Sequence, residues 1–351
     1  MLNQREKKYE ATKLTSTFLP RMKYVCHYRN LQLYLQLGMK LKKIHRVAGF
    51  QQSDFLKKYI DFCTLKRAAS KSPFEKRLYK LFVNAVFGKF IEQIRNYLEC
   101  KICYTPESAK KWVTSARFSS LKIISEDLVV VFLTPSKLIF NKAYPIGFTI
   151  LELSKYFMFS EYYQKIQPKL RTCEVLFSDT DSLALAVFSK NPKNPLKKLK
   201  NIMDFSNYPS DHPYHETKHA NALGFWKDEL QGETFSEYIG LRSKCYAMKI
   251  QKKKSYSIKS TCKGVRKGYK KKIPFSTFKN CIKTISQHYV TQYNIRSRSH
   301  LVNTMKLKKI AFSSFDDKRY LFICGIHSVP YGSCLIPKCQ KMNICPFCSE
   351  K

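Results

Sequence analysis

The stretch Val175-Leu-Phe-Ser-Asp-Thr-Asp-Ser-Leu-Ala-Leu-Ala-Val187 decides the fold that we predict for this chain. Apolar residues lead into Asp179-Thr-Asp-Ser182 and lead out again, which predicts a tight β-hairpin with two carboxylates at its tip. The second arm has two apolar faces, so we expect it to be well buried. An ordinary turn is the alternative, because Asp and Ser side chains often bond nearby backbone groups in turns.

Two carboxylates at such a tip form a candidate site for a hard divalent cation. Mg²⁺ typically binds one or two protein carboxylates and completes its shell with water and substrate phosphates. A pair of such ions can activate the attacking oxygen and stabilise the leaving oxygen in phosphoryl transfer. Asp179 and Asp181 are therefore the predicted catalytic residues and Mg²⁺ ligands.

A second motif lies upstream, in an apolar-periodic run from about Phe74 to Ile94 that predicts an amphipathic helix. Lys80, Asn84 and Phe87 are spaced by four and three residues, so they share one helix face. A cation, an amide and an aromatic ring suit the phosphates, sugar and base of a nucleoside triphosphate. Gly88 would let a ligand approach the backbone closely. The alternative is a core helix with one lysine extended along apolar surface.

A third motif lies downstream, in Gly240-Leu-Arg-Ser-Lys-Cys-Tyr-Ala-Met-Lys-Ile250. In a β-strand, Lys244 and Tyr246 would point to the same face. A lysine beside a tyrosine could bind a phosphate and the sugar edge at the end of a nucleic-acid strand. The alternative is an edge strand whose polar residues face solvent.

In this order the three motifs resemble the family B DNA polymerases, specifically the protein-primed branch. There a Lys-x-x-x-Asn-x-x-Tyr-Gly helix, a Tyr-x-Asp-Thr-Asp-Ser hairpin and a Lys-x-Tyr strand follow one another. Other stretches resemble the polymerases of large self-synthesising DNA transposons of the Maverick or Polinton type and their viral relatives. These stretches are Tyr24–Asn30, Lys43–Arg46, Asn84–Lys89, Leu241–Tyr246, Cys262–Val265 and Ser314–Tyr320.

The resemblance covers nearly all of the chain and implies an α+β fold. A polymerase palm, made of an antiparallel sheet with helices, would carry a fingers-like helix and a thumb. The implied activity is template-directed transfer of nucleotides from deoxynucleoside triphosphates to a primer 3′ hydroxyl, with two Mg²⁺ ions. The implied partners are a primer–template DNA and a terminal priming protein.

The resemblance also implies a role for each matching residue. Asp181 would be the main metal ligand and Asp179 a supporting one. Lys80 would neutralise the triphosphate, while Asn84, Phe87 and Gly88 would shape the nucleotide pocket. The residues expected to contact the primer or the DNA are Ser182, Lys244, Tyr246, Lys263 and Arg266.

The chain departs from the family pattern in a tolerable aromatic substitution and in two absences, of which the missing carboxylate motif limits the expected activity. Phe87 stands where the wider family usually has Tyr. Nothing in residues 1–79 matches the Asp-x-x-Ser-Leu-Tyr-Pro motif, whose Asp is another main metal ligand, and the proofreading exonuclease is also missing. We therefore expect a carboxy-terminal polymerase fragment that is weakly active or inactive alone. The alternative is a non-catalytic DNA-binding protein derived from a mobile element.

The charge of the chain agrees with a nucleic-acid partner. Its 351 residues include 64 Lys and Arg against 25 Asp and Glu, a formal net charge of +39. A surplus of this size is the electrostatic signature of polyanion binding. Interleaved aromatics such as Tyr246, Tyr256 and Tyr269 could stack on bases. An RNA-binding basic protein would have a similar charge, but it would not need the three motifs.

The cysteines predict reduced thiols and a zinc site. The 13 cysteines are scattered, and the first residues do not resemble a secretory signal, so we expect an intracellular protein, nuclear if it comes from a eukaryotic mobile element. No apolar run is long enough for a membrane span. Cys334, Cys339, Cys345 and Cys348 are the candidate ligands of a structural Zn²⁺. The alternative is a tail with free thiols.

The expected organisation has six parts. A helical basic region resembling the priming-protein contact insertion spans 1–70, and the fingers-like helix spans 71–98. Strands resembling a second insertion span 99–146, and the palm with the catalytic hairpin spans 147–250. A thumb-like basic region spans 251–330, and a Cys-rich tail spans 331–351. Within the palm, Thr149-Ile-Leu-Glu152 is a predicted capping box that would open a helix.

Overall fold

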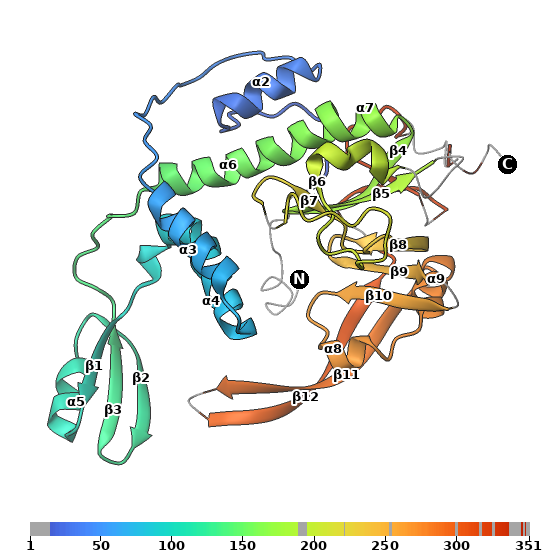
Figure 1. Ribbon diagram of the computed structural model, residues 1–351. Coiled ribbons are helices and arrows are strands. Elements are labelled where there is room, and N and C mark those ends of the chain that lie inside the picture. Colours follow the sequence, from blue (N-terminus) through green and yellow to red (C-terminus); the bar gives the residue numbers. More distant parts are fainter. Residues whose placement is uncertain are drawn as a thin grey trace.

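The protein is of the α+β class, as predicted. The computed structural model describes residues 15–188, 195–220, 222–252, 255–298, 301–315, 318–324, 327–336, 345–346 and 348. Helices and several small sheets of two or three strands alternate along this part of the chain (Figure 1). Because no large sheet unites the strands described, side-chain packing holds the units together. No helix in the described residues is both long enough and apolar enough to cross a membrane.

A long helical rod runs across the molecule and carries several of the other units (Figure 1). It consists of α6 (Tyr144–Ser160), the π-helical segment η2 (Glu161–Ile166) and α7 (Gln167–Leu170). At the rise of an α-helix its length is roughly 40 Å. The predicted capping box at 149–152 is wrong, because the helix already begins at Tyr144 and Glu152 lies inside it.

The buried carboxylate of Glu152 attaches α2 (Tyr28–Gln36) to this rod. Nδ2 of Asn30 donates to the Glu152 carbonyl oxygen at 2.8 Å and to Oε2 at 2.9 Å, and the His27 N–H donates to Oε2 at 3.2 Å. Nζ of Lys155 lies 2.6 Å from Oε1. Burial acts to raise the pKa of Glu152, but the hydrogen bonds from Lys155, Asn30 and His27 outweigh it, so the net pKa is lowered.

Glu152→Ala should weaken the attachment of α2. It removes the side-chain acceptor of the buried Asn30 amide, which keeps its bond to the backbone carbonyl, and the acceptor of the His27 N–H, at a cost of about 1–3 kcal/mol for each group. Urea unfolding should show this loss, with Glu126→Ala in an exposed turn as the control. A lowered pKa stabilises the fold above the unfolded value of about 4.3. The difference in free energy of unfolding between wild type and Glu152→Ala should therefore shrink as the pH falls through the pKa of Glu152 in the folded state. A difference that stays constant in acid would contradict the lowered pKa of Glu152.

The predicted amphipathic helix is confirmed as α4 (Pro73–Phe90), which packs against α3 (Lys57–Ala69) and against α6. Ser72 caps α4, since its Oγ accepts a hydrogen bond from the Phe74 N–H at 3.1 Å. Gly147 makes the contact with α6 possible. A Cβ atom there would lie 3.0 Å from the carbonyl oxygen of Phe87 and closer still to the side chain of Ile91.

Gly147→Ala should push α6 away from α4 and lower the free energy of unfolding by about 1–3 kcal/mol, as overpacking typically does. Gly88→Ala is the matched control, because an added Cβ there meets no atom within 4 Å. A helix interior favours Ala over Gly by about 1 kcal/mol, so this variant should be as stable as wild type or more stable. Equal destabilisation of both variants in thermal or urea unfolding would rule out the close contact at Gly147.

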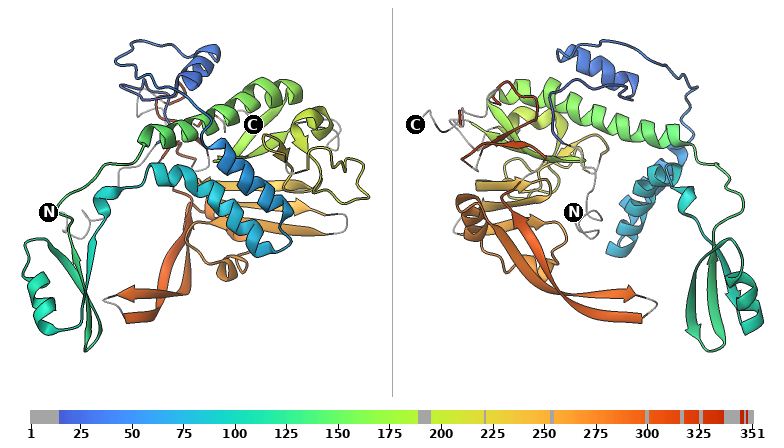
Figure 2. Two further views of the ribbon diagram at one scale, coloured as in Figure 1. Left: turned by 60° about the vertical axis from the view of Figure 1, so that its left-hand side comes forward. Right: turned by 180° about the vertical axis from the view of Figure 1, so that it is seen from behind.

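A small sheet with one helix follows α4 and projects from the rest of the molecule (Figure 2). The strands β1 (Glu99–Cys103), β2 (Phe118–Ser125) and β3 (Leu128–Leu133) pair with β3 in the centre, and α5 (Pro106–Val113) covers them. The predicted strand at Leu128–Leu133 is confirmed. Cys103, Val131 and Leu133 are buried in a core that also contacts Trp112. This unit therefore has a core of its own.

The predicted hairpin is confirmed as β4 (Cys173–Asp179) and β5 (Ser182–Val187), with Asp179 paired to Ser182. Leu183, Leu185 and Val187 of β5 pack with the helical rod in one core. That core also holds η3 (Leu196–Ile202) and the parallel pair of β6 (Met203–Asp204) with β7 (Trp226–Lys227). The expectation that β5 is well buried is wrong. Every residue of β5 is half-buried, because the two-stranded sheet rests on this core by one face.

The carboxy-terminal half is built on a sheet of β8 (Thr234–Arg242), β9 (Cys245–Gln251) and β10 (Tyr256–Cys262), with β9 in the centre. There follow α8 (Lys267–Lys270), α9 (Phe275–Lys283) and a long hairpin of β11 (Gln287–Arg298) and β12 (Leu301–Ser313). Ala247, Phe278 and Phe312 are fully buried in their common core. The expected palm–thumb boundary at 250/251 therefore falls inside one sheet and one core.

Two short strands, β13 (Tyr320–Leu321) and β14 (Ser328–Val329), pair near the carboxy terminus. Beyond them, Tyr331 forms a parallel bridge with Thr17 from the other end of the described chain. The first and last segments are thus joined directly.

Candidate functional site

Two β-turns meet at the predicted catalytic hairpin. Thr180 lies in the turn between β4 and β5 and has a φ of 58°, and Lys244 lies in the turn between β8 and β9 and has a φ of 57°. Left-handed backbone at non-glycine residues costs about 1–3 kcal/mol each and is frequent at functional sites. Nζ of Lys244 lies 3.0 Å from Oδ1 of Asp179. The hairpin motif and the lysine motif are therefore in contact.

The prediction that Lys244 and Tyr246 share a strand face is wrong, because Lys244 lies in the turn and only Tyr246 belongs to β9. The turn directs the ammonium group to the hairpin tip. Within that tip, Oγ1 of Thr180 donates to Oδ1 of Asp179 at 3.3 Å, and Oγ of Ser182 donates to the Asp179 carbonyl oxygen at 3.2 Å. Asp181 is exposed, so its carboxylate is the more accessible of the two.

An aromatic stack joins the hairpin to the β8–β10 sheet. The ring of Phe177 on β4 lies 4.5 Å from that of Tyr246 and 6.0 Å from that of Tyr238, nearly parallel to both. A register shift between Val175 and Phe177 interrupts the β4–β5 pairing next to Phe177. Aromatic ring pairs of this kind stabilise a fold by about 0.5–1.5 kcal/mol each beyond the effect of burial. One face of Tyr246 is thus occupied by Phe177, which limits its use for stacking on a base.

Sequence reasoning missed Tyr238. Burial, with a contribution from Tyr246, raises the pKa of the Tyr238 hydroxyl to about 12. One signal could have revealed it. Gly240 is the register partner of Tyr246, and a Cβ at Gly240 would collide with the Tyr238 ring. A glycine paired with a tyrosine across two strands leaves room beside the tyrosine ring, and here the ring of Tyr238 fills that room.

Several cations gather at the same end of the β8–β10 sheet. Cys262 pairs with Cys245, so Lys263 follows the strand end that lies beside Lys244. Lys263 and Arg266, the predicted DNA-contacting residues, are exposed, and their contact with DNA stays a prediction. The buried amide of Gln292 fixes their loop, because its Oε1 accepts from the Arg266 N–H at 3.0 Å and its Nε2 donates to the Gly264 carbonyl at 3.1 Å.

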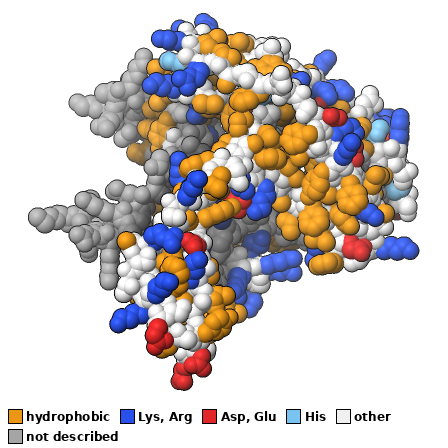
Figure 3. All heavy atoms as spheres, turned by 90° about the vertical axis from the view of Figure 1, so that its left-hand side faces the viewer, with side chains coloured by type: hydrophobic (Ala, Val, Ile, Leu, Met, Phe, Trp, Pro, Cys, Tyr) orange, Lys and Arg blue, Asp and Glu red, His pale blue; other side chains and the backbone are white. Residues whose placement is uncertain are grey.

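The predicted nucleotide-binding residues lie on another element. Lys80 and Asn84 are exposed on α4, while Phe87 and Gly88 are half-buried near its end. The helix packs on α3 and α6. Figure 3, which faces this side of the molecule, shows hydrophobic side chains at the surface, and the exposed ones on α3 and α4 include Phe62, Leu65, Phe74 and Leu81. That one bound nucleotide would contact both Lys80 on α4 and Asp181 at the hairpin tip stays a prediction.

The cysteine cluster differs from the predicted one. Cys345 and Cys348 do lie in a group that could hold a metal ion such as zinc, but their companions are Cys324 and His327. Cys334 is exposed and is not part of this group, and Cys339 lies outside the described residues. The Cys-x-x-His spacing of Cys324 and His327 was the signal in the sequence that could have identified them.

Comparison with known proteins gives no family assignment: no family model, no curated protein and no solved structure matches this chain. The candidate site therefore rests on the residues and their geometry.

The contact between Lys244 and Asp179 should contribute little to stability. The two side chains are 51% and 41% exposed. A double-mutant cycle with Lys244→Met and Asp179→Asn should give a coupling energy below about 1 kcal/mol that falls with added salt. A coupling well above this value would mean that the pair is structural, and would remove the reason to regard these residues as free for function.

Proposed function

We propose that this chain is the palm and thumb part of a protein-primed family B DNA polymerase. The observation that carries the proposal is the contact between Lys244 and Asp179. Two motifs about 65 residues apart in the sequence, each predicted to serve one polymerase site, lie side by side at 3.0 Å. The proposed reaction is attack of a primer 3′ hydroxyl on the α-phosphate of a deoxynucleoside triphosphate, directed by a DNA template.

The geometry suggests separate roles for the two carboxylates. Asp181 is exposed and would be the main Mg²⁺ ligand. Oδ1 of Asp179 is paired with Lys244, so binding of the metal through both Asp179 oxygens would require Lys244 to turn away. A primer phosphate near Lys244 would attract the ammonium group and release Asp179. Binding of the primer end and loading of the metal would then be coupled.

The basic surface supports a DNA partner. Lys263 and Arg266 stand near Lys244 at one sheet end, and the β11–β12 hairpin extends as a long arm with Lys306, Lys308 and Lys309 (Figure 1). The net charge of +39 favours binding to DNA phosphates that weakens strongly with added salt. In the proposed polymerase this arm would be part of the thumb. The remaining triphosphate contacts, Lys80, Asn84 and Phe87, would come from α4.

Primer extension tests the proposal. Wild type is expected to extend a primed template weakly with Mg²⁺ and deoxynucleotides, and Asp181→Ala should abolish extension while DNA affinity changes little, because the chemistry depends on the metal. Glu174→Ala, which removes an exposed carboxylate further along β4, is the matched control and should keep full activity. Full activity of Asp181→Ala would overturn the site.

The second candidate is a non-catalytic DNA-binding protein. The observation in its favour is that Lys244 neutralises the charge of Asp179, which leaves Asp181 as the carboxylate of the tip whose charge Lys244 does not offset. In that case neither wild type nor Asp181→Ala would extend a primer, yet both would bind DNA tightly. The salt dependence of binding would then fall by about one unit of slope for each of Lys263→Ala and Arg266→Ala.

A further inference from the structure

Three cysteines and one histidine come together outside the proposed polymerase site. Cys324 and His327 lie in the connection between β13 and β14, and Cys345 and Cys348 belong to the tail that follows. One ligand atom from each residue lies within 4.8 Å of every other. Cys345 is buried with Phe322 and Val329 in a small core.

The distances inside the cluster match a tetrahedral zinc centre. Nδ1 of His327 lies 3.4 Å from the sulfur of Cys324 and 3.5 Å from the sulfurs of Cys345 and Cys348. A Zn–S bond of about 2.3 Å and a Zn–N bond of about 2.05 Å at the tetrahedral angle place sulfur and nitrogen about 3.5 Å apart. Hydrogen bonding cannot explain three such contacts, because one ring nitrogen offers either one proton or one lone pair.

The local backbone also has the form of two metal-binding turns. Cys324 and His327 are separated by two residues, as are Cys345 and Cys348. The His327 N–H donates to the Cys324 sulfur at 3.4 Å, and the Cys348 N–H donates to the Cys345 carbonyl oxygen at 3.1 Å. Four protein ligands fill a tetrahedral shell and leave no open position, which is typical of structural rather than catalytic zinc.

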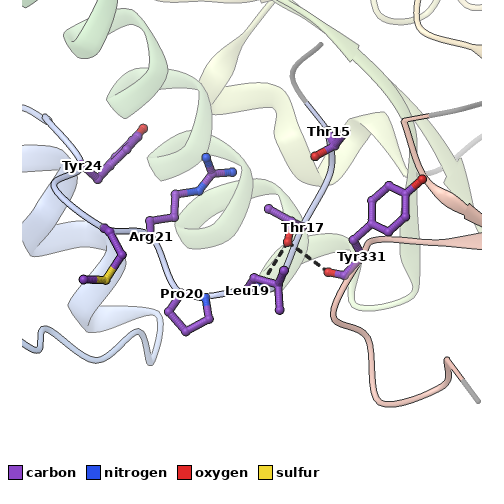
Figure 4. A pocket seen from close by; sticks show the side chains of 8 residues that line it. Thr15, Thr17, Leu19, Pro20, Arg21, Tyr24 and Tyr331 are labelled. Carbon is purple, nitrogen blue, oxygen red and sulfur yellow. Dashed lines mark hydrogen bonds between the residues drawn. The ribbon is translucent and has the colours of Figure 1, made fainter. Parts of the chain in front are cut away.

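The β13–β14 unit, which contains part of the cluster, binds residues 16–18 of the amino-terminal segment. The Ser16 N–H donates to the Lys318 carbonyl at 3.1 Å, the Phe18 N–H to the Tyr331 carbonyl at 2.8 Å, and the Tyr331 N–H to the Ser16 carbonyl at 3.0 Å. Oγ1 of Thr17 adds a bond to the Tyr331 carbonyl at 3.1 Å (Figure 4). The three-residue core of this unit is too small to order it alone, and small units of this kind commonly depend on a metal.

We propose that Cys324, His327, Cys345 and Cys348 bind one structural zinc ion, and that this ion orders the β13–β14 unit on which residues 16–18 dock. The proposal is independent of polymerase activity. Zinc binding would fix the two ends of the described chain to each other, so loss of the metal releases both.

Zinc content of the purified full chain tests the metal site. Wild type should contain one equivalent of zinc by mass spectrometry, and the double variant Cys345→Ser/Cys348→Ser should contain none. Cys334→Ser and Cys100→Ser, at exposed cysteines outside the cluster, should keep the metal. His327→Cys should also keep it, because four cysteines make an equally good zinc site. Wild type without zinc, or an unchanged zinc content in the double variant, would overturn the proposal.

Two measurements on wild type keep the test valid if a variant fails to fold. Titration with Co²⁺ should produce the charge-transfer absorption of cobalt bound to thiolates, and its absence would count against the site. Hydrogen exchange should then show that the Phe18 and Tyr331 amides exchange faster after zinc is chelated, while amides of β9 do not change. Equal exchange of Phe18 and Tyr331 with and without zinc would refute the docking role.

Discussion

The continuity of the helical rod from Tyr144 to Leu170 is the constraint on which most of the fold depends. Near its start, Gly147 accepts the close approach of α4. One turn further on, Glu152 holds α2 through buried hydrogen bonds. At its end, Tyr162, Ile166 and Leu170 form the core under the β4–β5 hairpin. One element therefore positions α4 and the hairpin, which carry the two halves of the proposed substrate site.

The candidate site itself depends on packing between small sheets. The β4–β5 hairpin and the β8–β10 sheet are not hydrogen-bonded to each other in the described chain, so the Phe177 stack and the ion pair at Asp179 connect them. Rings hold the sheets at a fixed spacing, while the exposed ion pair can open at little cost. This combination suits a site in which Lys244 alternates between a carboxylate and an incoming phosphate.

The proposed zinc centre and the proposed polymerase site place different demands on the chain. The polymerase site needs accessible charge at a hairpin tip, and Asp181 remains exposed there. The zinc centre needs thiols gathered around one imidazole, and Cys345 is buried beside His327. A metal that orders the β13–β14 unit would also secure the amino-terminal segment that leads into α2, and α2 is in turn fixed to the rod by Glu152.

Local patterns were enough to predict the α4 helix, the β4–β5 hairpin and the strand at Leu128–Leu133, because periodicity and turn chemistry act over neighbouring residues. The sequence also indicated the basic charge and half of the cysteine cluster. Three features became visible only in the folded chain: Lys244 contacts Asp179, Glu152 is buried rather than capping a helix, and Cys324 and His327 complete the cluster. These outcomes depend on contacts between residues distant in the chain, whose free energy comes from burial and pairing that no local pattern records.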